Sequence, residues 1–292
     1  MFRQNAIRAG VVPENGAGSR RFRREGSGVA GKIRIGIGGW TFEAWRGSFY
    51  PEGLPRRREL EYAARALTSI EINGTFYGSQ KPESFRKWHD ETPEDFVFAL
   101  KAPRFATNRK VLASAGESID RFFASGVLEL GDKLGPINWQ LAATKKFEPE
   151  DVAGFLDLLP AEVGGRKIAH VIEARHPSFA VPEYLDLLRA RGVAQVVAGD
   201  SEYPLIADPT APFVYARIMG TREGEAAGYS DHDLESWAAR ARAWAAGAAP
   251  EGLAPLGDGA ADGVARDVFL YVISGAKATN PAAARALIER IG

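Results

Sequence analysis

The sequence predicts a closed barrel of eight parallel strands with a helix after each strand, the (β/α)8 or TIM-type fold. Three observations lead to this class. Short runs rich in β-branched and aromatic residues alternate with longer segments of helical periodicity, which is typical of βα units and of a parallel sheet. Eight such runs can be counted along the chain. The length of 292 residues fits a single barrel, because barrels of this type run to about 250 residues or more.

The predicted strands are Ile33–Gly38, Ser69–Asn73, Phe96–Lys101, Pro136–Leu141, Ala169–Arg175, Ala194–Asp200, Phe213–Ile218 and Asp267–Ile273. Parallel strands need long crossover connections, so helices are expected to cover the sheet between them. A closed barrel leaves no unpaired strand edge, whereas the alternative, an open doubly wound sheet, leaves two. The first turn, GIGG, also leads into Trp40, Thr41 and Phe42 rather than into the glycine-opened helix of a dinucleotide-binding sheet.

Apolar residues between the strands recur at helical spacing. One stripe with the spacing i, i+3, i+4, i+7 consists of Leu60, Ala63, Ala64 and Leu67. A second stripe with the same spacing consists of Val152, Phe155, Leu156 and Leu159. Three prolines stand where helices can begin, because the first helical position needs no N–H donor; they are Pro149, Pro182 and Pro281.

The chain is expected to form one domain with two irregular regions. Residues 1–31 contain six arginines among Gly, Ser and Ala and too few apolar residues to bury, which predicts a disordered basic arm. Residues 32–292 are expected to form the barrel domain. Within it, residues 247–266 are rich in Gly, Ala, Pro and Asp, which predicts an exposed loop.

Composition excludes several classes of chemistry. The chain has no cysteine, so disulfides, thiolate nucleophiles and iron–sulfur clusters are ruled out. Lysine plus arginine equals aspartate plus glutamate, at 37 each, so no global positive field attracts nucleic acid or an anionic membrane. No long apolar stretch and no signal-peptide pattern occur, and we expect a cytoplasmic protein without a membrane partner.

Six stretches resemble a known family. They are GIGGWTFEAWRGSFYP at 36–51, SIEINGTFYGS at 69–79, FVFALKAPRFAT at 96–107, LGPINWQL at 134–141, IEARHPSF at 172–179 and FVYARIMG at 213–220. From Ile33 to the last residue the chain resembles the YecE-like family, domain-of-unknown-function family 72. The resemblance implies a closed αβ barrel, in agreement with the strand count, and brings no particular activity.

The chain departs from the family pattern at three places, which indicates a divergent subgroup. Asn108 and Met219 stand where the family commonly has histidine, and the residues 273–275, Ile-Ser-Gly, replace a Phe-Asn-Asn run. Family chemistry that needs an imidazole at position 108 or 219 is therefore not expected here.

Candidate site residues follow from the fold, because catalytic groups of such barrels lie at the carboxyl ends of the strands. The two-residue period of a strand points Glu71 and Asn73 inward, and likewise Glu173 with Arg175 and Tyr215 with Arg217. The remaining polar strand ends are Lys101, Gln140 and Asp200. The predicted mouth thus combines three carboxylates with three cations.

We expect Glu71, Glu173 and Asp200 to act as acid, base or metal ligand, and Lys101 to stabilise negative charge or form a Schiff base. Residues expected to bind substrate are Trp40, Asn73, Tyr77, Arg104, Gln140, Arg175 and Arg217. Arginine forks clamp carboxylate or phosphate, which predicts a small anionic or sugar-like ligand. These features favour an enzyme of the hydrolase, lyase or isomerase type.

Three alternatives stay open at this point. Buried charges must be paired, so the same residues can form a purely structural network of ion pairs. Carboxylates suit Mg²⁺ or Mn²⁺ better than Zn²⁺, so either ion is possible, but no dedicated metal site is predicted, and no nicotinamide, flavin or iron–sulfur signature occurs. The basic arm and the aromatic residues near the mouth can also engage nucleic acid, which is the less favoured partner.

Overall fold

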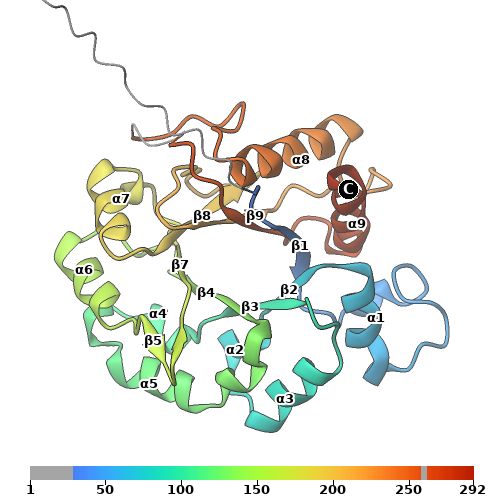
Figure 1. The fold of residues 1–292 in the computed structure, drawn as a ribbon, viewed down its shortest axis with the longest axis horizontal. Coiled ribbons are helices and arrows are strands. Elements are labelled where there is room, and N and C mark those ends of the chain that lie inside the picture. Colours follow the sequence, from blue (N-terminus) through green and yellow to red (C-terminus); the bar gives the residue numbers. More distant parts are fainter. Residues whose placement is uncertain (1–28, 258–261) are drawn as a thin grey trace, which may run out of the picture.

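The barrel is closed, as predicted. The computed structural model describes residues 29–257 and 262–292. In this part of the chain eight parallel strands pair in the order β1-β10-β9-β8-β7-β4-β3-β2, and β1 pairs again with β2 to complete the ring (Figure 1). The TIM-type fold class is therefore confirmed.

Each barrel strand coincides with one predicted run. The strands are β1 Ile33–Gly38, β2 Ser69–Ile72, β3 Val97–Lys101, β4 Leu134–Gln140, β7 His170–Glu173, β8 Ala194–Gly199, β9 Phe213–Ile218 and β10 Asp267–Val272. A short antiparallel hairpin, β5 Glu162–Val163 and β6 Arg166–Lys167, lies outside the barrel and was not expected. Its turn consists of Gly164 and Gly165 at φ of 57° and 78°, a backbone that favours glycine.

Helices surround the barrel (Figure 1). They are α1 Glu59–Ala66, α2 Gly74–Tyr77, α3 Pro82–Asp90, α4 Arg104–Thr107, α5 Gly116–Ala124, α6 Pro149–Asp157, α7 Pro182–Arg189, α8 Asp231–Ala245 and α9 Asn280–Ile291. Pro149 and Pro182 begin α6 and α7, and Pro281 is the second residue of α9. The helix starts inferred from proline are thus found in the structure.

The core has two layers, which follow from the alternation of side chains along each strand. Outward residues such as Ile70, Ile172 and Val214 pack between the strands and the helices. Inward residues form a second buried cluster inside the barrel, which includes Val171 and Tyr215. The prediction that the polar residues at the strand ends point into the barrel depends on the same alternation.

The two irregular regions are only partly described. Of the predicted arm, residues 1–28 lie outside the described residues, and Gly31 N donates to Ala245 O at the end of α8 over 2.9 Å. In the predicted loop 247–266, Val264 is 48% exposed whereas Arg266 is buried. Across the described part of the chain, every helix is too short or too polar to cross a membrane.

The barrel interior is tight at β1, where glycines let neighbouring strands approach. A Cβ atom at Gly36 would lie 2.0 Å from the carbonyl oxygen of Ser69 on β2, a contact that only a backbone shift relieves.

We predict that Gly36→Ala lowers the free energy of unfolding by about 3 kcal/mol, because the added methyl group overpacks the strand pair. Urea denaturation measures the change. Gly224→Ala is the matched control, since its Cβ atom meets nothing within 4 Å. Equal stability of the two variants would show that the close approach at β1 does not constrain the barrel.

Candidate site at the carboxyl-terminal mouth

Arg217 is the centre of a buried ion-pair network near the carboxyl ends of the strands. Its Nη1 atom donates to Glu173 Oε2 over 2.7 Å, and its Nη2 atom donates to Glu71 Oε1 over 3.0 Å. Arg217 comes from β9, Glu173 from β7 and Glu71 from β2, so a single guanidinium ties three strands together. Both carboxylates are fully buried.

The other carboxylate oxygens are also engaged. The Tyr215 hydroxyl donates to Glu71 Oε2 over 2.6 Å, and Asn138 Nδ2 donates to Glu173 Oε2 over 3.0 Å. Arg175 Nε donates to Glu173 Oε1 over 2.8 Å. Each carboxylate therefore has a partner on both oxygens, as buried charges require.

These contacts set the protonation states of the network. Burial alone would raise the pKa of Glu173, but Arg217 and Arg175 together lower it below its usual value. Burial disfavours the charge of Arg217, yet Glu173 and Glu71 outweigh burial and raise the pKa of Arg217. Glu173 is therefore an ionised carboxylate at neutral pH.

A cavity of about 680 Å³ opens above this network. Its cationic lining residues are Lys101, Arg175, Arg217 and Lys277, and none of the described residues that line it is acidic. Its aromatic lining residues are Trp40, Phe76, Tyr77 and Trp88. With Glu71 and Glu173 below the floor, four cations face two carboxylates, and the site has an excess of positive charge.

Arg175 is held with its guanidinium at the cavity wall. Its Nη2 atom donates to Gln140 Oε1 over 2.7 Å and its Nη1 atom to the Tyr203 hydroxyl over 3.1 Å. The guanidinium also lies 4.3 Å from the centroid of the Tyr203 ring. These contacts, together with the ion pair to Glu173, fix the orientation of the guanidinium at the cavity wall.

Lys101 is the other distinctive group of the cavity. Its side chain leaves the end of β3, is largely buried, and places Nζ 4.1 Å from the centroid of the Phe76 ring. Burial lowers the pKa of Lys101 to about 8; Arg217 and Arg175 act in the same direction, whereas Glu71 and Glu173 oppose it. Lys101 can thus gain or lose a proton near neutral pH.

The structure brings most of the expected site residues together and leaves two apart. Asn73, Gln140, Trp40 and Tyr77 line the cavity. Arg104 is exposed beside Phe105 and is not among the lining residues.

Asp200 also lies away from the cavity. Its backbone turns into the left-handed region at φ 53°, and its carboxylate accepts from Trp237 Nε1 on α8 over 2.8 Å. The strand period stops at Gly199, so it does not orient the next side chain inward.

Sequence reasoning missed Lys277, which follows β10 in a short helical turn. Its Nζ atom lies 4.4 Å from the centroid of Phe42, and burial lowers its pKa. Its carbonyl oxygen accepts from Trp45 Nε1 over 2.9 Å, which links the loops after β1 and β10. The available signal was its position after the last strand, a usual place for ligand-binding residues in barrels.

In residues 29–257 and 262–292 no group of three or more His, Asp or Glu side chains is arranged to hold a metal ion. His176 instead accepts from Ser178 N over 3.1 Å and caps a short helical turn. His170 is buried outside the barrel and accepts from Trp139 Nε1 over 3.0 Å, and burial lowers its pKa to about 4.

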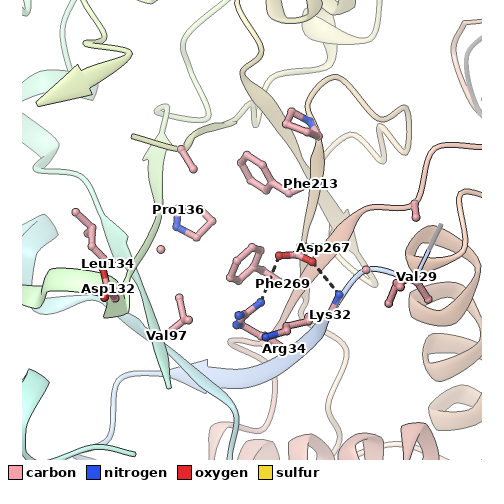
Figure 2. A pocket seen from close by; sticks show the side chains of 16 residues that line it. Val29, Lys32, Arg34, Val97, Asp132, Leu134, Pro136, Phe213, Asp267 and Phe269 are labelled. Carbon is pink, nitrogen blue, oxygen red and sulfur yellow. Dashed lines mark hydrogen bonds and ion pairs between the residues drawn. The ribbon is translucent and has the colours of Figure 1, made fainter. Parts of the chain in front are cut away.

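A second cavity, of about 720 Å³, lies at the opposite, amino-terminal end of the barrel (Figure 2). Figure 2 shows the Arg34 guanidinium directed at Asp267, with Nη1 3.5 Å from Oδ2, and the backbone N–H of Lys32 donating to Asp267 Oδ1 over 2.8 Å. The Arg34 guanidinium also lies 5.4 Å from the centroid of Phe269. Two acidic residues, Asp132 and Asp267, line this cavity beside its cations Lys32 and Arg34. We place the candidate site at the carboxyl-terminal mouth, where the cations face the cavity.

Comparison with known proteins agrees with this architecture. The chain is 31% identical over 173 residues to the UPF0759 protein YecE of Escherichia coli O157:H7, a match that covers 56% of this chain and 58% of that protein. It is 27% identical over 191 residues to the UPF0759 protein YunF of Bacillus subtilis (strain 168), covering 62% of this chain and 64% of that protein. The matched regions thus span less than two thirds of these relatives.

Solved structures share the fold. A DUF72 family protein from Thermotoga maritima MSB8 superposes with a TM-score of 0.64 at 22% identity, covering 88% of this chain and 97% of that one. A DUF72 family protein from Enterococcus faecalis V583 gives a TM-score of 0.62 at 16% identity, covering 90% of this chain and 99% of that one. At these identities the likeness concerns the fold.

The family assignment rests on a match across the whole barrel. The family model described as "Protein of unknown function DUF72" matches residues 34–292, from the second residue of β1 to the end of the chain. The resemblance expected from the sequence motifs is thereby confirmed, and this chain belongs to the DUF72 family.

Proposed function

We propose that this protein is an enzyme that binds a small anionic substrate in the carboxyl-terminal mouth and carries out acid–base chemistry on it. The observation that carries the proposal is the cavity wall, which is lined by four cations and, among the described residues, by no acidic side chain. Charge-assisted hydrogen bonds from arginine to carboxylate or phosphate are among the strongest contacts that a protein makes with a small molecule.

The dimensions and the lining suit a substrate with both an anionic and an apolar part. A volume of about 680 Å³ lies within the range of small-molecule sites. Trp40 and Trp88 pack edge to face with their ring centroids 5.2 Å apart and form one apolar wall. The substrate is therefore a small organic anion rather than a bare inorganic ion.

The geometry favours Lys101 as the group that exchanges a proton with the substrate. Glu71 and Glu173 are fully buried, and their oxygens are occupied by Arg217, Arg175 and neutral donors. We propose that these carboxylates position the arginines, a different role from the acid–base one expected from the sequence. A divalent metal would have to displace these arginine contacts, so none is part of the proposal.

The nucleic-acid alternative depends on the basic arm. Residues 1–28 lie outside the described residues, and nothing in the described mouth favours a strand over a small anion. We therefore do not propose it.

We predict saturable sulfate binding that weakens as the pH rises through about 8, because Lys101 then loses its charge. Sulfate stays dianionic throughout, so the change reports on the protein. Calorimetry, together with the fluorescence of Trp40 and Trp88, measures the affinity. Arg175→Gln is expected to weaken binding on the order of tenfold, the equivalent of one charge-assisted hydrogen bond.

Arg285→Gln is the matched control, because Arg285 is exposed on α9 away from the cavity. Lys277→Gln is a second test variant that leaves the buried network intact. Equal sulfate affinity in Arg175→Gln, Lys277→Gln and the control would place binding elsewhere and refute the proposal.

We also predict that Lys101→Met stabilises the protein at pH 7 by up to about 3 kcal/mol, because the folded state disfavours the charged amine. Above pH 10.5 the amine is neutral in both states and costs nothing. As the pH falls from 10.5 to about 8, Lys101 takes up a proton in the unfolded chain but not in the folded protein, so the folded protein loses stability. Below about 8 both states are protonated, and this loss of stability no longer grows.

Urea denaturation at pH 7 and at pH 10.5 measures the difference in the free energy of unfolding between Lys101→Met and the unaltered protein, which should be present at pH 7 and absent at pH 10.5. Lys146→Met is the control, because Lys146 is exposed and its replacement should change stability by less than about 0.5 kcal/mol. A destabilised Lys101→Met variant at pH 7 would indicate that Lys101 is held as a structural charge.

A further inference from the structure

Lys101 differs from the other buried lysines of the described chain in having no hydrogen-bond partner. Lys133 Nζ donates to Thr92 O over 2.7 Å and to the carbonyl oxygen of His89. Lys145 Nζ donates to Asp151 Oδ2 over 2.6 Å and to the carbonyl oxygen of Lys110 over 2.8 Å. Those two lysines are structural cations. Within residues 29–257 and 262–292, Lys101 Nζ accordingly makes neither a hydrogen bond nor an ion pair. It lies over the face of the Phe76 ring.

We propose that the Lys101 amine attacks the carbonyl carbon of the substrate and forms an imine, which makes the substrate an anionic aldehyde or ketone. This inference rests on the proposed function, since it names the substrate class of the same cavity. A lysine that serves only as a fixed charge gains from pairing with a carboxylate or carbonyl. A nucleophilic lysine needs an unpaired amine at a surface that the substrate reaches, and Lys101 lines the cavity.

The backbone under Lys101 is rigid. Lys101 pairs with Asn138 on β4, its carbonyl oxygen accepts from Thr75 Oγ1 over 2.6 Å, and Ala102 N donates to Asn138 O over 2.8 Å. The amine is therefore presented from a fixed strand end, beside the two guanidiniums that hold the anionic group. A carbonyl next to that anionic group is thereby directed towards Nζ.

The step balances without a further reactant. The neutral amine adds to the carbonyl carbon, so that a C–N bond forms and the C=O π electrons move to oxygen, which takes a proton. Loss of that oxygen as water gives the protonated imine, and the sum is ammonium plus carbonyl to iminium plus water. The positive charge stays on nitrogen, so its contact with the Phe76 ring is kept.

The protonation behaviour of Lys101 supports this role. Burial, helped by the two arginines, lowers its pKa to about 8. At pH 7 about 10% of such an amine is neutral, against about 0.03% for a lysine of pKa about 10.5. The fraction of neutral, reactive amine is thus larger by more than two orders of magnitude. The lower nucleophilicity of a less basic amine offsets part of this gain in rate.

Reductive trapping tests the proposal. The full-length protein is incubated at pH 7 with pyruvate, glyoxylate or pyridoxal 5′-phosphate in the presence of sodium cyanoborohydride, and the adducts are located by peptide mass spectrometry. We expect at least one of these probes to label Lys101 about tenfold faster than the exposed Lys110 and Lys146. Sulfate should slow labelling at Lys101 alone, and Lys101→Met should lose the fast phase while Lys146→Met keeps it.

The outcomes separate this inference from the proposed function. Saturable sulfate binding in the mouth, with no probe trapped on Lys101 or with labelling spread evenly over the lysines, would overturn the imine and leave the anion site standing. Absence of both sulfate binding and trapping would overturn both. Fast labelling of Lys101 by acetone as well as by the anions would contradict the requirement for an anionic carbonyl compound.

Discussion

The contact of one guanidinium with two buried carboxylates determines the arrangement of the mouth. Arg217 bridges Glu71 and Glu173, residues 146 and 44 positions away in the sequence. Breaking such a buried pair costs about 3–5 kcal/mol, whereas an apolar replacement of the whole set is often neutral or stabilising. Stability alone therefore gives little reason to keep the network. A better reason is that the network fixes the guanidinium groups of its arginines beneath the cavity.

The charges of the cavity follow from this arrangement. The carboxylates compensate the arginines from below, so a ligand meets the cations and not the acids. Lys101 and Lys277 add charges that these carboxylates do not neutralise, and burial lowers the pKa of both amines. An anion that enters the cavity would raise the pKa of both amines back towards the ordinary value of a lysine. Binding and proton uptake are thus expected to be coupled.

Much of the fold and part of the site could be predicted from the sequence. Strand positions and inward faces follow from the two-residue period of each strand, which is a local property of the sequence. This period predicts that Glu71, Glu173 and Arg217 point into the same mouth, and the structure brings the three side chains together there. The pairing among them depends on closure of the barrel and could not be read locally. Asp200 escaped the pattern because its left-handed backbone ends the period, and Lys277 because it lies on a loop, where no period exists.

The most direct test of the central claim is a crystal soaked in selenate, with the anion located by the anomalous scattering of selenium. We predict a strong peak in the mouth within hydrogen-bond distance of Arg175 and Arg217, with Lys101 Nζ turned towards it. A peak at the opposite end of the barrel beside Arg34, with none between the two arginines of the mouth, would contradict it.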